Sequence, residues 1–414
     1  MDQVTEFEAQ SYATDAALLA ELRASWPPAV ATDAPAGGHL GYVRADIAAL
    51  QPVGALRLTD SFAVALAAEP GAVEGAFNVV PLVRGGGDRW RRARPGDGLS
   101  AFVAGVPMAS ERPVGVDQTH DSVVVGERAI VKWFRRVGPG PSRAATLIAQ
   151  LAAVGFGGIP TPLGSLGWRS RAGAELTLAQ GDAYLSGARD GWEWCVERVP
   201  DDVTVGRELG QLVASLHRAL ATPSAVIAEP ISTATADDVA GWRAAAVVTL
   251  HEALTLDDDP ELASFAPRML EVLERPLTAG DFELQPVHGD LHVGQVLEWS
   301  GRFAVIDFDG NPALPDAANA VRQPRERDVA QMLSSLDHVG RVVDERSGRT
   351  RTREAERWIG AVREGFLASV GPLDEPLVAA FEVEQECREL VYAARFLPRW
   401  RYAPMATLQA RYGR

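Results

Sequence analysis

Lysine is almost absent from this chain of 414 residues: Lys132 is the only one among 40 basic side chains, and arginine supplies the rest. Acidic residues outnumber basic ones, 55 to 40, which gives a net charge of −15. Non-specific nucleic-acid binding depends on cationic side chains that neutralise phosphates, so we expect no nucleic-acid partner. The negative charge is compatible with a cationic substrate.

Cysteine and long apolar runs are also scarce. Cys195 and Cys387 are the only cysteines, and their wide separation gives neither a disulfide framework nor a metal-binding pair. This pattern fits a reducing cytoplasm. No apolar stretch is long enough to cross a bilayer, and the acidic N-terminus lacks a signal-peptide pattern. We therefore expect a cytoplasmic protein, monomeric or homodimeric, with no membrane partner.

The spacing of apolar residues predicts an α+β protein in three parts. Short apolar runs between turns predict a β-rich cap, a mixed region follows, and helical spacing dominates after it. Trp192–Arg198 is expected to be a strand, preceded by a lid or hinge loop at Gly181–Asp190. Leu99–Val106 is expected to belong to the β-rich part. The predicted domains are 1–110, 111–198 and 199–414, and the family resemblance described below implies that they are a cap, an N-lobe-like subdomain and a helical C-lobe.

Two segments carry the groups that phosphoryl transfer requires: Val287–Leu297 (VHGDLHVGQVL) and Val305–Pro312 (VIDFDGNP). Asp290 offers a carboxylate that can accept the proton of an attacking alcohol. Gln295 offers an amide oxygen. Asp307 and Asp309 are expected in a short apolar strand, where a carboxylate has little structural reason to lie unless it binds a cation such as Mg²⁺.

Three further residues need separate interpretation. His288 and His292 flank Asp290, and a structural hydrogen-bonding role is expected for both. Lys132 lies in Ala129–Phe134, an apolar run that predicts a buried strand. A single lysine in a chain whose other basic residues are all arginine suggests a position that needs a compact ammonium. The alternative is chance retention, with the ammonium reaching to water.

The order of these segments resembles the bacterial maltokinases and the maltokinase-like glucosamine kinases, from about residue 110 to 400. The matching segments include DGWEWCVERV at 190–199 and LGQLVASLHRAL at 209–220. This family has an aminoglycoside-phosphotransferase-like, bilobal protein-kinase-like fold. The resemblance implies ATP and Mg²⁺ as cofactors and a small sugar or amino sugar as acceptor.

The resemblance also implies a role for each matching residue. Asp290 would be the catalytic base, Gln295 and Asp307 would bind Mg²⁺, and Asp309 is a candidate third ligand. Lys132 would contact the nucleotide phosphates. The loop at 118–122 lacks a glycine triplet, so its backbone and hydroxyl groups would cover the phosphates, and adenine would stack near residues 180–184. The implied nucleotide-binding residues are Lys132, Gln118, Thr119, Ser122, Gln180 and Tyr184.

One position departs from the family pattern. Kinases of this type pair the strand lysine with a glutamate on the next helix, and Ala144 stands where that acid is expected. After Lys132, the next carboxylate in the chain is Glu175. Lys132 must therefore be oriented by another group, such as Asp307, or be ordered only when nucleotide binds.

The acceptor site is expected near the C-terminal helices. In Phe381–Pro404, three glutamates fall on one helical face with aromatic residues nearby, a combination that suits a sugar with an amine. A solvated helix face is an equally good interpretation, and Asp281 with Glu283 is a second acidic candidate. The predicted substrate residues are Glu382, Glu386, Glu389, Tyr392 and Trp400.

These observations predict ATP-dependent phosphorylation of a sugar hydroxyl, with glucosamine to glucosamine 6-phosphate as the first choice. A maltokinase that makes maltose 1-phosphate is the alternative enzyme. A nucleotide-binding regulatory pseudokinase is the alternative from another class, suggested by Ala144.

Overall fold

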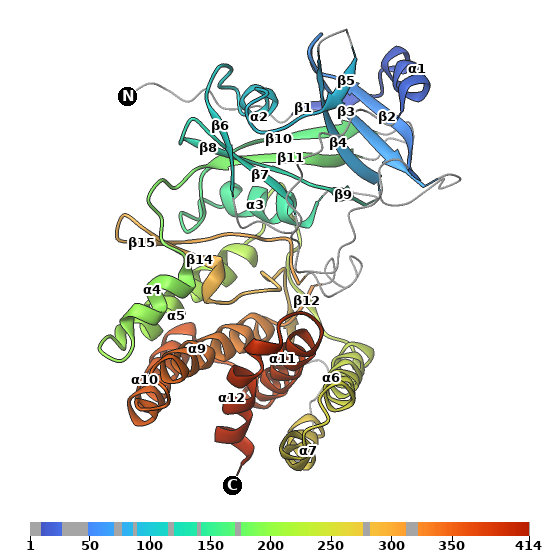
Figure 1. Ribbon diagram of the computed structural model, residues 1–414. Coiled ribbons are helices and arrows are strands. Elements are labelled where there is room, and N and C mark those ends of the chain that lie inside the picture. Colours follow the sequence, from blue (N-terminus) through green and yellow to red (C-terminus); the bar gives the residue numbers. More distant parts are fainter. Residues whose placement is uncertain are drawn as a thin grey trace. The chain divides into compact units, whose positions relative to one another are not determined.

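The computed structural model describes residues 10–26, 49–69, 77–85, 89–114, 120–138, 142–169, 175–275, 282–311 and 322–413. The chain forms two compact units (Figure 1). The first consists of Met1–Thr146 and Pro160–Ser186, and the second of Leu147–Ile159 and Gly187–Arg414. The boundary at Ser186 lies within the loop expected to be a lid or hinge.

The first unit is built on a six-stranded sheet with the order β1-β10-β11-β8-β7-β6. Strands β7 and β8 pair as an antiparallel hairpin, and β1 pairs in parallel with β10. The strands are β1 (Gln10–Ala13), β6 (Glu111–Pro113), β7 (Asp121–Val125), β8 (Ala129–Trp133), β10 (Pro162–Arg169) and β11 (Glu175–Ala183).

A second sheet in the same unit forms the expected β-rich region. Helix α1 (Ala16–Ser25) buries Leu18 and Leu22 in a cluster with Ala65 of this sheet. Strand β9 pairs with β4, so this sheet is continuous with the segment that follows Lys132. The predicted domain boundary at residue 110 therefore lies inside one compact unit, and the division into a cap and an N-lobe-like subdomain stays a prediction. The strands are β2 (Gln51–Arg57), β3 (Phe62–Ala68), β4 (Phe77–Arg84), β5 (Trp90–Arg92) and β9 (Arg136–Val137).

Two local predictions were wrong. Leu99–Val103 is a short helix, α2, which begins after Gly98 at a left-handed φ of 87°. Gly191–Arg198 is helix α4, although its aromatic and β-branched residues favour a strand. The side chain of Asp190 accepts a hydrogen bond from the backbone N–H of Trp192 at 2.8 Å, a typical helix N-cap.

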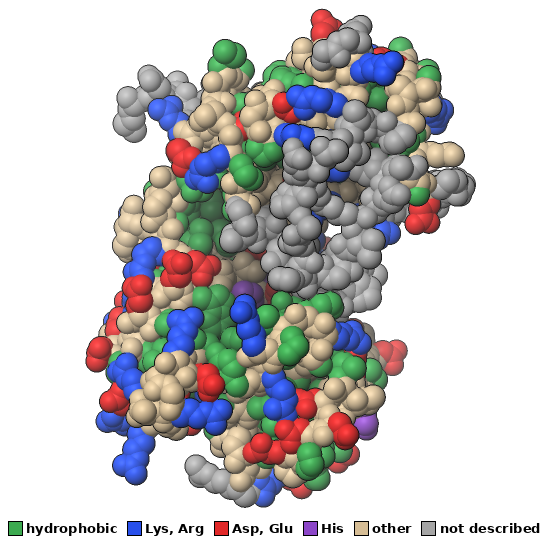
Figure 2. All heavy atoms as spheres, in the orientation of Figure 1, with side chains coloured by type: hydrophobic (Ala, Val, Ile, Leu, Met, Phe, Trp, Pro, Cys, Tyr) green, Lys and Arg blue, Asp and Glu red, His purple; other side chains and the backbone are tan. Residues whose placement is uncertain are grey.

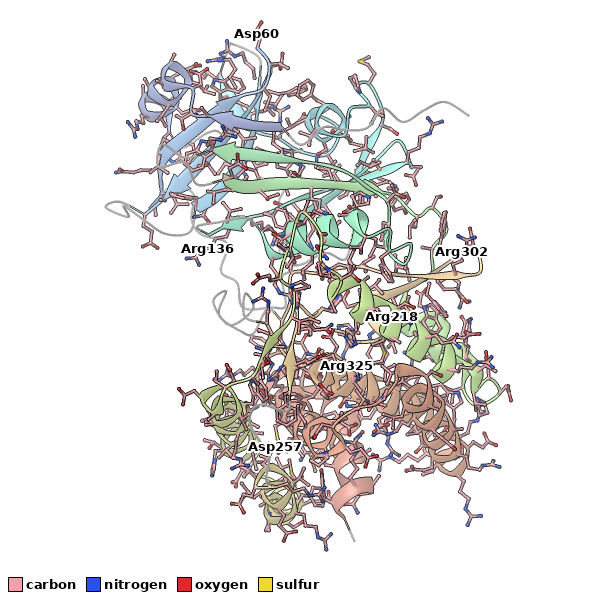
Figure 3. All side chains as sticks on the ribbon, turned by 180° about the vertical axis from the view of Figure 1, so that it is seen from behind. Asp60, Arg136, Arg218, Asp257, Arg302 and Arg325 are labelled. Carbon is pink, nitrogen blue, oxygen red and sulfur yellow. The ribbon has the colours of Figure 1, made fainter. Side chains whose placement is uncertain are left out.

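The second unit consists mainly of helices, with two small hairpins. Arg302 begins one strand of the β14–β15 hairpin, and Arg325 directly precedes α9 (Figure 3). The helices are α5 (Thr204–Leu220), α6 (Ala236–Leu256), α7 (Pro260–Leu273), α9 (Glu326–Arg346), α10 (Thr352–Val370), α11 (Glu375–Phe396) and α12 (Tyr402–Tyr412). The remaining elements are β12 (Ser232–Thr233), β13 (Glu283–Leu284), η2 (Val293–Gln295), β14 (Val296–Trp299), β15 (Arg302–Val305) and η3 (Pro398–Trp400). Helix α3 (Arg143–Ala153) crosses the boundary between the units.

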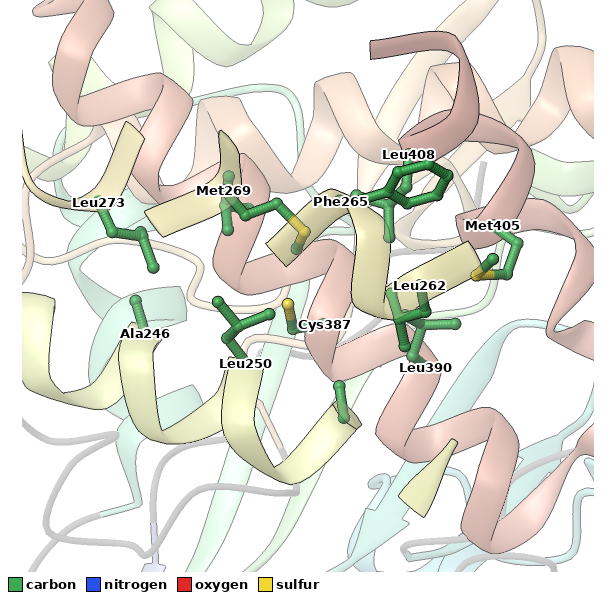
Figure 4. Close-up of a cluster of buried hydrophobic side chains, with 12 residues drawn as sticks. Ala246, Leu250, Leu262, Phe265, Met269, Leu273, Cys387, Leu390, Met405 and Leu408 are labelled. Carbon is green, nitrogen blue, oxygen red and sulfur yellow. The ribbon is translucent and has the colours of Figure 1, made fainter. Parts of the chain in front are cut away.

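An apolar core fixes the C-terminal helices of this unit. Leu250 of α6, Phe265 and Met269 of α7, Leu390 of α11 and Leu408 of α12 are all buried in one cluster (Figure 4). Burial of such side chains contributes about 1.5–3 kcal/mol each. The cluster holds the apolar face of α11, so the acidic residues of that helix are presented on its other faces.

The surface carries charges of both signs. On the face seen in Figure 2, acidic and basic side chains are interspersed over the helical unit. None of the helices in the described ranges is long and apolar enough to span a membrane.

Candidate active site

Asp290 lies in an irregular segment that one buried residue of α9 holds in place. The two carboxylate oxygens of Asp328 accept hydrogen bonds from the backbone N–H groups of His288 and Gly289, each at 2.8 Å. His217 of α5 lies 2.9 Å from the same carboxylate. Burial opposes the charge of Asp328, but the hydrogen bond and charge of His217 and the other donors lower its pKa.

Two further side chains of α9 bind the same segment. Gln331 accepts a hydrogen bond from the N–H of Leu291 and donates one to the carbonyl of Gly289, both at 3.0 Å. Ser335 accepts a hydrogen bond from the N–H of Val293 at 3.1 Å. A segment without regular secondary structure thus has its backbone groups satisfied by one helix face, which makes it rigid.

Asp290 has the properties of a general base. Its side chain is half-buried, and its carboxylate accepts no hydrogen bond from any residue that the structure describes. Burial, followed by the negative charges of Asp307 and Glu389, raises the pKa of Asp290 to about 8. A raised pKa strengthens a carboxylate as a proton acceptor once it is ionised.

His288 has the structural role expected for it. Its Nδ1 accepts the backbone N–H of Asp290 at 3.3 Å, so the proton of the neutral ring lies on Nε2. That Nε2–H donates to the carbonyl of Ile306 at 2.9 Å. The imidazole therefore links the segment of Asp290 to the residue before Asp307.

Asp307 and Asp309 do not lie in a strand, as predicted, but in the turn that follows it. Strand β15 ends at Val305, and Asp307 has a left-handed φ of 64°. Such a conformation in a residue other than glycine is uncommon and is concentrated at functional sites. The amide Nε2 of Gln295 donates a hydrogen bond to the exposed Asp307 carboxylate at 3.5 Å, so the two side chains lie side by side.

This arrangement fits a magnesium ion held mainly by substrate. A carboxylate and an amide side chain from Asp307 and Gln295 approach each other, and half-buried Asp309 lies two residues further on. The described residues contain no group of three or more His, Cys, Asp or Glu side chains that could bind a metal by themselves. Mg²⁺ is commonly bound by one or two carboxylates together with phosphates, so the donor set is suitable.

In the first unit, Lys132 lies in β8 between two polar neighbours. The strand register pairs it with Ser122 of β7 on one side and Gln180 of β11 on the other. Its neighbours Val131 and Trp133 are buried, so Lys132 points to the opposite, less buried face of the sheet. Ser122, Lys132 and Gln180 therefore share one face. Two other residues of the predicted nucleotide site, Gln118 and Thr119, lie outside the described residues.

Asp182 is a functional candidate that the sequence did not reveal. It lies two residues after Gln180 on the same strand face, and the Gln180 amide donates to it at 3.1 Å. Burial raises the pKa of Asp182 to about 6, while the hydrogen bond from Gln180 and the positive charge of Lys132 act in the opposite direction. Helix α3, where kinases of this type carry the glutamate partner of the strand lysine, has no acidic residue. Asp182 supplies a carboxylate near Lys132 instead.

Tyr184 lies just past β11, and its side chain is already engaged. Its hydroxyl accepts a hydrogen bond from Arg112 at 2.9 Å, and the same guanidinium lies 5.3 Å from the centre of its ring. Stacking of adenine on Tyr184 would have to share the ring with Arg112.

The three glutamates of α11 have different environments. Glu382 is ion-paired with Arg363 and Arg411, each at 2.8 Å. Glu386 is fully buried, and His338 lies 2.9 Å from its carboxylate. Both carboxylates thus have charged or polar partners within the helical unit.

Glu389 is the glutamate whose charge acts on Asp290. It is half-buried, and its oxygens accept hydrogen bonds from Trp400 at 2.7 Å and from Gln385 at 3.0 Å. Its negative charge contributes to the raised pKa values of Asp290 and of Tyr392, although burial is the larger cause for both. Glu389, Trp400 and Tyr392 therefore belong to one neighbourhood. Glu283 lies exposed in β13, and Asp281 lies outside the described residues.

The N-terminus of α4 completes this neighbourhood. Trp192 packs edge-on against Trp400, with ring centres 5.7 Å apart. A Cβ on Gly191 would lie 1.6 Å from the carbonyl oxygen of Val293, so glycine permits the close approach of α4 to the segment that follows Asp290. The sequence pattern did not reveal Trp192 as a site residue, because it predicted a strand at this position.

Comparisons with known proteins agree with this chemistry. A family model described as the phosphotransferase enzyme family matches residues 112–338. Glucosamine kinase from Streptacidiphilus jiangxiensis is 39% identical over 376 residues, which cover 80% of this chain and 84% of the relative. Glucosamine kinase from Mycolicibacterium smegmatis is 36% identical over 374 residues, which cover 80% of this chain and 92% of the relative.

Solved structures give the same result. A glucosamine kinase in crystal form B matches with a TM-score of 0.77 and 36% identity, over 88% of this chain and 94% of that one. A glucosamine kinase in complex with glucosamine, ADP and inorganic phosphate matches with a TM-score of 0.76 and 36% identity. That match covers 93% of this chain and 95% of the other.

Proposed function

Because the chain belongs to the phosphotransferase enzyme family and is similar along most of its length to glucosamine kinases, we propose that it transfers the γ-phosphate of ATP to the C6 hydroxyl of glucosamine. The observation that carries the proposal is the Asp290 carboxylate, on a segment held in place by Asp328 and Gln331 and under the influence of the charge of Glu389. Asp290 suits a base for the sugar hydroxyl, and Glu389 suits an ion-pair partner for the sugar amine.

Asp290 accepts the proton of the sugar hydroxyl as the oxygen attacks the γ-phosphorus. A new P–O bond forms, the bond to the β-phosphate oxygen breaks, and ADP leaves with that electron pair. The amine of the sugar arrives as a cation beside Glu389. This positive charge offsets one of the negative charges that raise the pKa of Asp290, so substrate binding favours the ionised base.

The acceptor site consists of Glu389, Trp400 and Tyr392. The hydrogen bond from Trp400 orients the Glu389 carboxylate, and the indole offers an apolar surface for the sugar ring. Glu382 and Glu386 were also proposed from the sequence. Their ion pairs with Arg411 and His338 instead favour a structural role, which leaves Glu389 as the first candidate.

The nucleotide site uses the polar face of the larger sheet. Lys132 suits a contact to the phosphates, with Ser122 as a neighbouring hydroxyl donor. The base would lie near Gln180 and Tyr184. Gln118 and Thr119 remain predicted contributors to the loop over the phosphates.

Gln295 and Asp307, with Asp309 as a further candidate, would hold Mg²⁺. When bound, the ion neutralises charge on the phosphates and helps to orient them. The left-handed backbone at Asp307 supports this assignment, since it presents the carboxylate beside the Gln295 amide.

Both cysteines are free and buried, which supports the proposal of a cytoplasmic enzyme. A monomer or a homodimer stays a prediction that sedimentation can test.

A coupled assay of ADP release tests the proposal across glucosamine, glucose, maltose and an aminoglycoside. The proposal requires the highest kcat/KM for glucosamine. A preference for maltose would support the maltokinase alternative. Nucleotide binding without turnover of any acceptor would support the pseudokinase alternative.

A further inference from the structure

The two histidines of the segment HGDLH make the same local hydrogen bond through Nδ1 but differ in the hydrogen bonding of Nε2. In each, Nδ1 accepts the backbone N–H of the residue two positions later: Asp290 for His288 at 3.3 Å and Gly294 for His292 at 3.1 Å. The Nε2 of His288 is satisfied by the carbonyl of Ile306. Within the described part of the chain, no residue accepts a hydrogen bond from the Nε2 of His292.

The hydrogen bond at Nδ1 determines the tautomer of His292. A backbone N–H can only donate, so Nδ1 must carry a lone pair, and the proton of the neutral ring lies on Nε2. Burial lowers the pKa of His292, which also favours the neutral ring. His292 therefore has a fixed Nε2–H donor that is not used within the described structure.

The surroundings of His292 are those of the acceptor site. A Cβ on Gly294 would lie 2.8 Å from Cε1 of His292 and 2.9 Å from Nε1 of Trp192, so both rings lie over this glycine. Trp192 contacts Trp400, and Trp400 donates to Glu389. Burial is the largest cause of the lowered pKa of His292, and the negative charge of Glu389 is the largest cause acting in the opposite direction.

We propose that His292 is a substrate-binding residue that donates its Nε2–H to an oxygen of the acceptor sugar. This inference rests on the proposed function and identifies the chemical pattern that the site recognises. Glu389 accepts hydrogen bonds from the substrate, and His292 donates one. A hydrogen-bond acceptor beside a hydrogen-bond donor selects a vicinal amino alcohol. In such a compound, the carbon that carries the ammonium is bonded to a carbon that carries an oxygen. In glucosamine, the oxygens next to the amine-bearing carbon are those on C1 and C3.

Steady-state kinetics with modified substrates test this inference. KM and kcat are measured for glucosamine and for its 1-deoxy and 3-deoxy analogues, in the wild type, His292→Asn and His292→Gln. The Asn side chain can still accept the N–H of Gly294 but does not reach the position of Nε2. The Gln side chain can place an amide N–H there.

We expect His292→Asn to raise KM for glucosamine about three- to tenfold, with a smaller change in kcat and an unchanged KM for ATP. His292→Gln should restore part of the loss. In the wild type, one deoxy analogue should show the same increase in KM, and His292→Asn should add nothing further for that analogue. That analogue identifies the recognised oxygen.

Three results would overturn the inference. The first is that His292→Asn raises KM further for both deoxy analogues. The others are that it raises KM for ATP instead of glucosamine, or that His292→Gln recovers none of the lost affinity for glucosamine. Melting temperature and ATP binding show whether each variant is folded. His288→Asn serves as a matched control, because it should lower stability without producing this dependence on a substrate oxygen. A wild type inactive on glucosamine would instead refute the proposed function itself, before any comparison of variants.

Discussion

The Nε2–H of His288 donates to the carbonyl of Ile306 at 2.9 Å, and this bond joins the two segments that carry the proposed catalytic carboxylates. Asp290 lies two residues after His288, and Asp307 follows Ile306 directly. Asp328 binds the backbone of His288 from the other side. One buried network thus positions both the proposed base and the proposed metal ligand.

Replacement of Asp290 by Asn should abolish turnover and leave nucleotide binding intact. The amide has nearly the same shape but cannot accept the hydroxyl proton, so we expect kcat to fall about 10²–10⁴-fold. Calorimetry with ATP and Mg²⁺ should give an affinity close to that of the wild type. Turnover within threefold of the wild-type rate would contradict the assignment of Asp290 as the base.

Asp307→Asn and Asp307→Ala separate the role of the carboxylate from that of the backbone. Both should lose magnesium-dependent nucleotide binding. Asparagine tolerates the left-handed φ of 64°, so Asp307→Asn should keep wild-type stability. Asp307→Ala should lose about 1 kcal/mol in the free energy of unfolding. Unchanged affinity for ATP with Mg²⁺ in Asp307→Asn would remove Asp307 from the metal site.

Asp182→Asn should stabilise the free protein in a pH-dependent way. The raised pKa of about 6 means that the folded state favours the protonated carboxyl, so the stability of the wild type falls as pH rises from about 4 to 6. Asparagine lacks this titration. The variant should therefore exceed the wild type at pH 7 by roughly 3 kcal/mol at most, and by little near pH 4.

Melting curves of the wild type and Asp182→Asn at several pH values provide the measurement. If the Asp182 carboxylate orients the ammonium of Lys132, the KM of the variant for ATP should also rise, although a negative charge near the phosphates is removed. A difference in melting temperature that does not change with pH would show that Asp182 is ionised in the folded protein at low pH, contrary to this account.

Glu389→Gln should reduce the discrimination between glucosamine and glucose. The glutamine can still accept the hydrogen bond from Trp400, so the shape of the site is kept while its charge is lost. A hydrogen bond to a charged group contributes about 1.5–3 kcal/mol, which predicts a fall of about tenfold or more in the ratio of kcat/KM values.

Two controls sharpen this measurement. Glu283→Gln changes an exposed glutamate of β13 and should leave the ratio unaltered. Glu386→Gln disrupts the buried pair with His338 and should lower stability more than selectivity. If Glu389→Gln keeps the wild-type ratio, the amine is recognised by another group.

The proposed catalytic residues could be singled out in the sequence because they lie in short linear segments. Asp290 and Gln295 are five residues apart, and Asp307 follows twelve residues later. Asp328 and Gln331, which hold the backbone around Asp290, lie about forty residues away on a helix whose local pattern gives no indication of this contact. Only the tertiary fold brings them together.

Helical periodicity also could not distinguish the three glutamates of α11. It grouped Glu382, Glu386 and Glu389 on one face, but their roles depend on Arg411, His338 and Trp400, which other segments supply. The strand predicted at Trp192–Arg198 was wrong because the N-cap at Asp190 and the burial of Trp194 outweigh intrinsic strand preference.

The most direct test of the central claim is to identify the product formed from ATP and glucosamine by the wild-type protein. Proton and phosphorus NMR spectra distinguish a phosphate on C6 from one on C1 or C3. This account predicts glucosamine 6-phosphate, formed in equal amount to ADP, and none from Asp290→Asn. ADP release without a phosphorylated amino sugar, or a product phosphorylated at another carbon, would contradict it.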